Sequence, residues 1–195
     1  MTSDPHIKGL FRRISIDDDQ DAYKELFYIL QPRLNQFAFS ILRSVEEAED
    51  IVSDAFIRIW EKRKLLLHVE SPRFYMYSAV KNLSLNRMKR NKRQASLVSD
   101  EWAVQLTSIY ADPEQMMISG EVIRKIQLAV DGLPPRCRMI FKLVKEDGLK
   151  YREVSELLSL SIKTVEAQMA IALRRIAQCM PVDIKKAPVL IRPAK

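Results

Sequence analysis

The chain has 195 residues, enough for one large or two small domains, and its 47% hydrophobic and 29% charged residues are typical of an ordinary globular protein. Its 32 basic and 25 acidic residues leave a formal net charge of +7, which favours an acidic partner such as nucleic acid. The first residues do not form a signal peptide, no apolar run approaches the roughly 20 residues of a membrane span, and two cysteines suit a reducing compartment, so we expect a cytoplasmic protein without membrane insertion.

Apolar residues recur at helical spacing in the first part of the chain. A stripe from Tyr23 to Leu30 is followed, after Pro32, by a second stripe from Leu34 to Leu42. The strongest pattern begins after Ser44, which with Glu47 forms a capping box, and consists of Ala48, Ile51, Val52, Ala55, Phe56, Ile59 and Trp60. No convincing period-2 strand is present, so the sequence predicts an all-α fold.

The segment 71–93 is expected to form a basic helix, opened by Ser71 as N-cap and Pro72 in the first turn. It holds seven Lys or Arg and no Asp or Glu. Its inward face carries Met76, Ala79, Val80 and Leu83. Its candidate nucleic-acid face combines an aromatic ring, amides and cations: Tyr75, Ser78, Asn82, Asn86, Lys89, Arg90 and Arg93. The alternative is a solvated basic helix whose aromatic residues, Phe74 in particular, belong to the core.

Residues 94–123 contain no Lys or Arg but several acidic residues. We interpret 94–111 as a flexible acidic linker between two small helical domains, 1–93 and 112–180. Asp112-Pro113 is expected to open the next helix, which carries Val122, Ile123, Ile126 and Val130. The residues 181–195 are expected to form a flexible tail.

The spacing of a helix-turn-helix occurs between Tyr151 and Ile176. A short first helix carries Val154, Leu157 and Leu158, and Ser159–Ser161 form the turn, with Ser161 as N-cap. The inward face of the second helix is Ile162, Val165, Met169, Ala172, Leu173 and Ile176. Its outward face, which could reach DNA bases and phosphates, is Lys163, Thr164, Ala167, Gln168, Ile171, Arg174 and Arg175. The alternative is a plain helical hairpin.

The sequence contains no set of residues that would indicate catalysis. His6 and His68 are isolated, no Cys/His cluster has metal-ligand spacing, and no Gly-rich phosphate loop occurs. We therefore expect neither an enzyme nor a bound cofactor or metal ion.

Together, three segments resemble the extracytoplasmic-function sigma factors of bacteria, from about Asp21 to Gln178. "AEDIVSDAFIRIW" resembles the family's helix for binding core RNA polymerase, although Ser53 stands where Gln is common. "FYMYSAVKNLSLNRMKRNKR" resembles the helix that opens and reads the −10 promoter element. "LPPRCRMIFKLVKEDGLKYREVSELLSLSIKTVEAQMAIALRRI" resembles the domain that reads the −35 element, with Ile171 in place of a frequent Arg.

The resemblance implies a monomer whose partners are core RNA polymerase and promoter DNA, with an anti-sigma factor as a further candidate partner. It assigns the −10 element to the basic helix, with opened bases held near residues 64–70, and the −35 element to the helix-turn-helix. The polymerase-binding set would be Glu49, Asp50, Ser53, Phe56, Arg58 and Trp60.

Two other classes of protein remain open from the residues alone. A stand-alone helix-turn-helix regulator would explain the second domain but not a second basic, aromatic face far from it in the chain. An RNA-binding or scaffolding helical protein would leave the helix-turn-helix unexplained.

Overall fold

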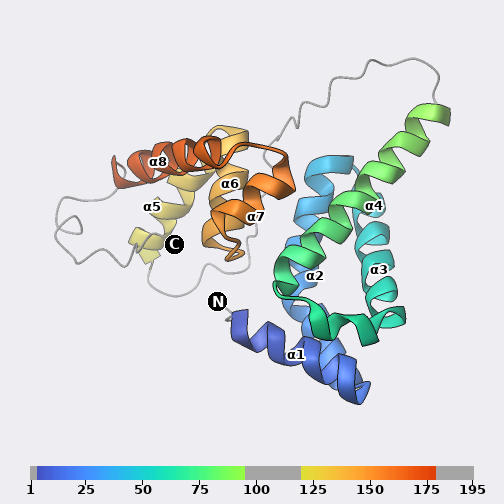
Figure 1. Cartoon of the computed structure of the whole chain (residues 1–195). Coiled ribbons are helices and arrows are strands. Elements are labelled where there is room, and N and C mark those ends of the chain that lie inside the picture. The colour runs from blue at the N-terminus through green and yellow to red at the C-terminus, as the bar shows by residue number, and fades with distance from the viewer. Residues whose placement is uncertain (1–3, 95–119, 179–195) are drawn as a thin grey trace. The chain divides into compact units, whose positions relative to one another are not determined.

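All the regular structure in the described residues, 4–94 and 120–178 of a computed structural model, is helical (Figure 1). The elements are α1 (Asp4–Asp17), α2 (Gln20–Leu42), α3 (Val45–Glu61), the 3-10 helix η1 (Arg63–His68), α4 (Pro72–Gln94), α5 (Gly120–Asp131), α6 (Pro135–Lys145), α7 (Tyr151–Leu158) and α8 (Ile162–Gln178). The chain divides into two compact units, one built from α1 to α4 and the other from α5 to α8. The prediction of an all-α fold with two helical domains is confirmed.

Three predicted features fall outside the described residues. The predicted linker 94–111 lies outside them except for Gln94, the last residue of α4. The predicted helix start at Asp112-Pro113 and the tail 181–195 lie wholly outside. Within the described ranges, no helix is both long and apolar enough to cross a bilayer.

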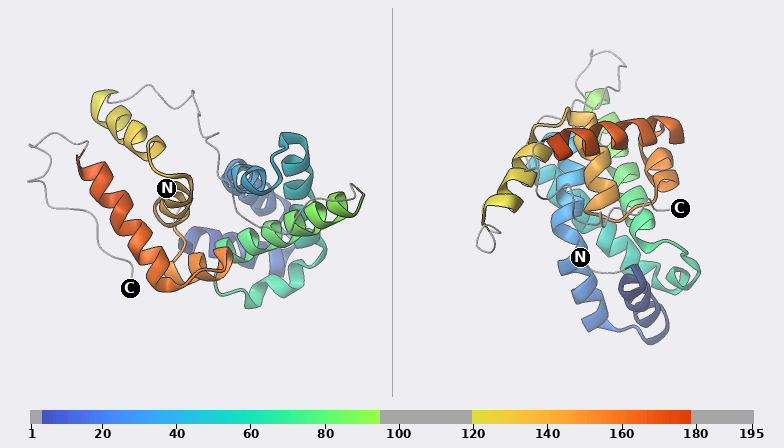
Figure 2. Two further views of the ribbon diagram at one scale, coloured as in Figure 1. Left: turned by 90° about the horizontal axis from the view of Figure 1, so that it is seen from above. Right: turned by 90° about the vertical axis from the view of Figure 1, so that its left-hand side faces the viewer.

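In the first unit, α4 lies against both α2 and α3, and α1 packs on α2, α4 and η1 (Figures 1 and 2). The side chains between these helices are almost fully buried, including Ile14, Leu26, Leu30, Phe56, Ile59, Met76 and Val80. Burying one such side chain contributes about 1.5–3 kcal/mol. This core fixes which sides of α3 and α4 remain on the surface.

Helix α2 continues through Pro32 and joins the two apolar stripes that the sequence shows on either side of it. A proline inside a helix lacks one backbone donor and costs about 3 kcal/mol. Leu30 and Leu34 flank Pro32 and are both buried, so packing against the unit offsets that cost. The helix ends at Arg43, which adopts a left-handed conformation with φ of 63°.

Helix α1 is absent from the sequence-based predictions. Ile7, Leu10, Phe11 and Ile14 follow the i, i+3, i+4, i+7 pattern, and all four are buried. Asp4 Oδ1 lies 3.7 Å from Nε of the buried Arg73, in the first turn of α4. Helix α1 therefore contacts the first turn of α4 through Asp4 and adds its buried side chains to the core.

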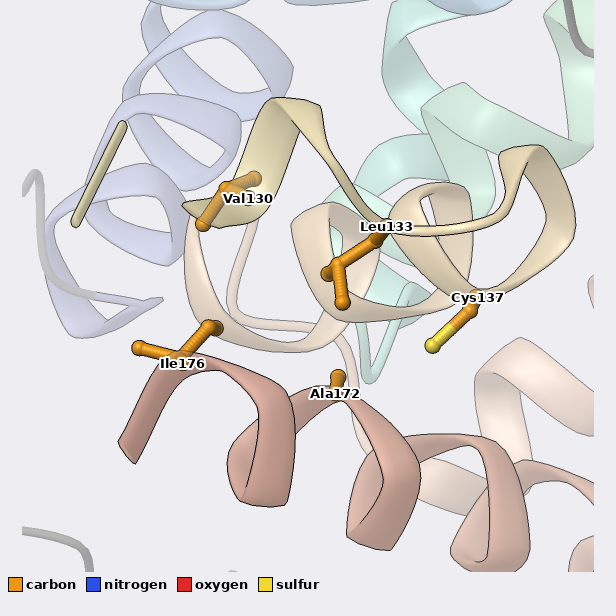
Figure 3. Close-up of a cluster of buried hydrophobic side chains, with 5 residues drawn as sticks. All are labelled: Val130, Leu133, Cys137, Ala172 and Ile176. Atoms are coloured by element: carbon orange, nitrogen blue, oxygen red, sulfur yellow. The ribbon is translucent and has the colours of Figure 1, made fainter. Parts of the chain in front are cut away.

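In the second unit, α8 packs on α5, α6 and α7. Figure 3 shows the buried cluster between α5, α6 and α8, formed by Val130, Leu133, Cys137, Ala172 and Ile176. The Cys137 thiol also donates to the backbone oxygen of Gln168, with 3.2 Å between the sulfur and the oxygen. These contacts fix α8 on one side and leave its other side exposed.

The turn between α7 and α8 has the geometry expected of a helix-turn-helix. Ser159 is left-handed, with φ of 55° and ψ of 46°. Ser161 caps α8, because its hydroxyl accepts from the backbone N–H of Thr164 at 3.0 Å. One predicted core residue is misplaced: the side chain of Ile162 is 44% exposed, because no preceding helical turn covers the first residue of α8.

Candidate DNA and partner interfaces

Helix α4 presents the polar part of its predicted nucleic-acid face on the surface. Asn82, Asn86 and Lys89 are all exposed and occur at i, i+4 and i+7, which brings them to one side of the helix. Arg90 is exposed beside them, while Ser78 is half-buried. The backbone of Arg93 belongs to α4, and its side chain is outside the described part of the chain.

The aromatic residues at the start of α4 have separate roles. Tyr77 is buried, with its ring centroid 5.1 Å from that of Phe37. Tyr75 is half-buried and meets Phe11 of α1 edge to face, with 6.5 Å between centroids and 89° between planes. Tyr77 is therefore a core residue, as in the alternative that the aromatic residues of this helix belong to the core. Tyr75 instead remains partly exposed beside the polar face.

The segment before α4 is fastened to the corner between α1 and α2. The Asp18 carboxylate accepts from Arg63 Nε and lies 2.9 Å from Lys64 Nζ, while the Ser15 hydroxyl donates to the Lys64 carbonyl at 3.3 Å. The Arg63 guanidinium also lies 4.7 Å from the centre of the Trp60 ring. Asp18 itself has a φ of 52°, a conformation that Asp tolerates better than most residues. Contacts from two helices thus hold η1 in place.

We expect the attachment of η1 to weaken at acid pH. Hydrogen bonds from Lys64 and then from Arg63 lower the pKa of Asp18, so its stabilising contribution is present above its ordinary pKa and lost as the pH falls through the lowered value. Asp18→Asn should therefore reduce the acid sensitivity of the first unit below about pH 4. Trp60 fluorescence in a Trp102→Phe background measures this transition.

The neighbouring exposed carboxylate supplies the control for this experiment. Asp17→Asn makes the same chemical change one residue earlier and should leave the acid transition unchanged. An identical shift in both variants would contradict a specific role for Asp18.

Helix α8 exposes most of its predicted outward face. Lys163, Ala167, Ile171, Arg174 and Arg175 are exposed, whereas Thr164 and Gln168 are half-buried. The Thr164 hydroxyl lies 2.8 Å from that of Ser161, so it also belongs to the helix cap. Glu166, which is not part of the predicted outward face, is exposed in the same first turns and carries the opposite charge to Lys163.

The polymerase-binding set on α3 divides into surface and core residues. Glu49, Asp50, Ser53 and Arg58 are exposed, and Trp60 is half-buried with its ring centroid 5.0 Å from that of Tyr23. Phe56 is only 1% exposed, and its ring packs 4.8 Å from that of Phe27. Its expected direct contact with a partner does not fit this burial, so we assign Phe56 a packing role. Ile57, which the sequence-based set omitted, is 55% exposed.

The start of α3 is also tied to α4. Ser44 caps α3 by accepting from the backbone N–H of Glu47 at 3.2 Å. The Glu47 carboxylate accepts from Asn91 Nδ2 at 2.8 Å and lies 3.8 Å from Arg87 Nη1. The N-cap of the predicted capping box is therefore present, and Glu47 links the two helices.

Two family models match the chain, one in each unit. The model for sigma-70 region 2 matches residues 26–94, and the model for sigma-70 region 4 matches residues 123–176. The two matches contain the candidate surfaces on α3, α4 and α8.

Individual proteins are also similar to this chain. The ECF RNA polymerase sigma factor SigW of Bacillus subtilis is 28% identical over 158 residues, which cover 77% of this chain and 84% of SigW. The ferric citrate uptake sigma factor FecI of Escherichia coli is 26% identical over 129 residues, 66% of this chain and 73% of FecI. Among solved structures, the sigma factor RpoE of Bartonella quintana, crystallised with the anti-sigma factor NepR, has a TM-score of 0.49 at 17% identity, over 83% of this chain and 98% of RpoE.

Proposed function

The chain belongs to the extracytoplasmic-function sigma factors of the sigma-70 family, and from that premise we propose which of its surfaces bind the polymerase and which bind promoter DNA. The protein binds core RNA polymerase and directs it to promoters through region 2 and region 4. It is not an enzyme, because the chemistry of RNA synthesis belongs to the polymerase. We place it in the cytoplasm, where polymerase and promoter DNA meet.

In this proposal, the exposed side of α3 binds the polymerase. Its residues would be Glu49, Asp50, Ser53 and Ile57, with Trp60 at the margin. Ile57 would be the apolar anchor among these polar and charged side chains, and a protein interface commonly surrounds an apolar anchor with a polar rim. Phe56 supports this surface from below by packing between Tyr23 and Phe27.

Helix α4 would act on the −10 element while the duplex opens. Opening breaks base stacking, which costs about 1.4 kcal/mol per base-pair step. The ring of Tyr75 could stack on an unpaired base, and the amides of Asn82 and Asn86 could bond exposed base edges. Lys89, Arg90 and Arg93 would neutralise backbone phosphates, and the segment 64–70, fastened through Asp18, would border the opened bases.

Helix α8 would read the −35 element from the major groove. Lys163, Ala167 and Gln168 lie in its first two turns, which is the part of a recognition helix that reaches base edges. Arg174 and Arg175 lie near its C-terminal end and suit phosphates, and Thr164, whose hydroxyl lies 2.8 Å from that of the capping Ser161, would face the groove. Ile171 offers an apolar contact in place of a cation.

The observation that carries the proposal is the presence of two polar and cationic helical surfaces, on α4 and α8, in two separate units. Purified core polymerase tests it: adding this chain should produce transcripts from defined start sites. The chain alone should bind duplex DNA weakly. Tight binding of a dimer of the free chain to a palindrome, without polymerase, would instead favour a stand-alone helix-turn-helix regulator.

Substitutions on α8 should separate base reading from phosphate binding. Lys163→Ala should change the preference among −35 variants by about 1–3 kcal/mol, because a good base contact is worth that much. Gln168→Ala should have a smaller effect of the same kind, since Gln168 is half-buried. Arg174→Ala and Arg175→Ala should weaken all promoters equally and reduce the salt slope by about 0.9 each.

The measurement is binding of the reconstituted polymerase to a set of −35 variants at several salt concentrations. Gln178→Ala, in the last turn of α8, is the control and should leave both quantities unchanged. Uniform effects of all four interface substitutions on every promoter would contradict the division of α8 into base-reading and phosphate-binding parts.

A further inference from the structure

A pocket of about 430 Å³ lies between α3 and α4, beside the edge of the exposed α3 surface that carries Asp50. Its polar lining consists of Asp54 and Arg58 from α3 and of Asn86, Arg87, Lys89 and Arg90 from α4. All of these side chains except Arg87 are exposed, so the pocket opens to solvent. Two surface helices therefore contribute to one shared concave site.

The side chains that line this pocket carry a net positive charge. Four of its lining side chains are cations and one, Asp54, is an anion. Cations gathered at one site repel one another, and an anion bound at the site would offset this repulsion. The pocket therefore favours an anionic ligand over an apolar one.

Arg87 is held at the edge of the pocket by carboxylates of α3. Its Nη1 lies 3.8 Å from Glu47 Oε1 and 3.9 Å from Asp50 Oδ2, and its side chain is 27% exposed. These distances allow ionic attraction but exceed those of a hydrogen bond. Arg87 is thus oriented by Glu47 and Asp50, while its donors are not committed to them by hydrogen bonds.

Arginine, lysine and asparagine together suit a phosphate group. The planar guanidinium of Arg can bind two phosphate oxygens at once, Lys supplies a point charge, and the amide of Asn donates a hydrogen bond. Carboxylate ligands would meet the same cations but would gain less from so much positive charge. The volume is at the lower end of the range of small-molecule pockets, enough for a phosphate and part of its sugar.

We propose that the pocket between α3 and α4 binds a phosphate group, with Arg58 reaching it from α3 and Arg87, Lys89 and Arg90 reaching it from α4. Asn86 and Lys89 lie on the same side of α4 as Asn82, so a DNA strand following that face runs over the pocket. The phosphate is therefore one of the promoter backbone, and this part rests on the proposed function. A free polyphosphate has the same chemistry and is the other source that the experiment must distinguish.

The proposal changes the role of one residue. Arg58 moves from the polymerase-binding set to the DNA-binding surface. In a helix with 3.6 residues per turn, Glu49 and Arg58 are separated by about 180°, so they occupy opposite edges of the exposed side of α3. Helix α3 would then face polymerase with one edge and the promoter backbone with the other.

The first arm of the experiment measures promoter binding by the reconstituted polymerase against salt concentration. Arg58→Gln should reduce the slope by about 0.9, the value for one phosphate contact, and should leave the affinity of the chain for core polymerase unchanged. Arg12→Gln removes one exposed cation from α1 and is the matched control, with no expected change in either quantity. Loss of affinity for core polymerase in Arg58→Gln, with an unchanged salt slope, would overturn the proposal.

The second arm uses the full chain alone with inorganic triphosphate, and it remains informative even if the chain fails to support initiation. Side-chain NMR signals of Arg58 and Arg87 should shift on titration in the wild type, and Arg58→Gln should weaken the binding. Binding at micromolar concentration together with an unchanged promoter slope would support the phosphate site but assign it to a free polyphosphate. No shift at millimolar triphosphate and no change in the promoter slope would together refute the site.

Discussion

Replacing Tyr75 by alanine is expected to slow promoter opening by about 5- to 150-fold, because base–aromatic stacking contributes about 1–3 kcal/mol per base. The ring stands edge to face with Phe11 at 6.5 Å, so it is held by α1 while part of it remains exposed. Asn82→Ala should act on the same step, because Asn82 would bond only to base edges that opening exposes. Initial docking on closed duplex should change little in either variant.

A promoter with a pre-melted bubble at the −10 position identifies the affected step. The bubble should largely restore initiation by Tyr75→Ala, while Lys89→Ala should stay impaired on both templates because backbone phosphates are present before and after opening. Tyr75→Phe retains the ring and should behave nearly as wild type. Phe11→Leu removes the supporting ring but keeps Tyr75, and it measures how much of the effect comes from packing. Equal impairment of Tyr75→Ala on duplex and bubble would show that Tyr75 is a packing residue.

The second large effect is expected at adjacent residues of α3. Phe56→Ala should lower the free energy of unfolding of the first unit by about 3–5 kcal/mol, because it leaves a cavity beside Phe27 and Tyr23. Ile57→Asp should leave that stability nearly unchanged, since Ile57 is 55% exposed. It should instead weaken binding to core polymerase by about 1–2 kcal/mol, roughly 5- to 30-fold.

Thermal unfolding and titration of a labelled chain with core polymerase measure the two quantities separately. Ile16→Asp is the matched control, because Ile16 is also exposed, at 49%, but belongs to α1 and not to α3. It should alter neither stability nor binding by a comparable amount. Wild-type binding by Ile57→Asp would remove Ile57 from the interface.

The helices with strong local signals could be predicted from the sequence. The beginnings of α3 and α4 follow from Ser44 and Ser71-Pro72, and the turn before α8 follows from Ser161, because capping depends on residues close in the chain. The side of α4 that carries Asn82, Asn86 and Lys89 could also be predicted, since helical geometry alone groups them.

Features that depend on neighbours from distant parts of the chain could not be predicted from the sequence. Helical periodicity places Phe56 on the apolar stripe of α3. Whether Phe56 can contact a partner protein depends on α2, because Tyr23 and Phe27 of α2 cover its ring. The position of Arg58 beside α4 likewise depends on how two helices pack. Helix α1 is a different case, because the helical spacing of its buried apolar residues is present in the sequence. The proline and the charged residues near its start made this helical pattern harder to recognise.

Asp50 belongs to two of these surfaces at once. Its carboxylate is among the residues assigned to polymerase, and its Oδ2 also lies 3.9 Å from Arg87 in the phosphate pocket. A polymerase that draws Asp50 toward itself would leave Arg87 with less negative charge nearby and so improve it as a phosphate ligand. Binding free energies are reciprocal, so promoter DNA must then tighten the hold on polymerase by the same factor. An exposed ion pair is worth about 0–1 kcal/mol, which limits this cooperativity to about fivefold.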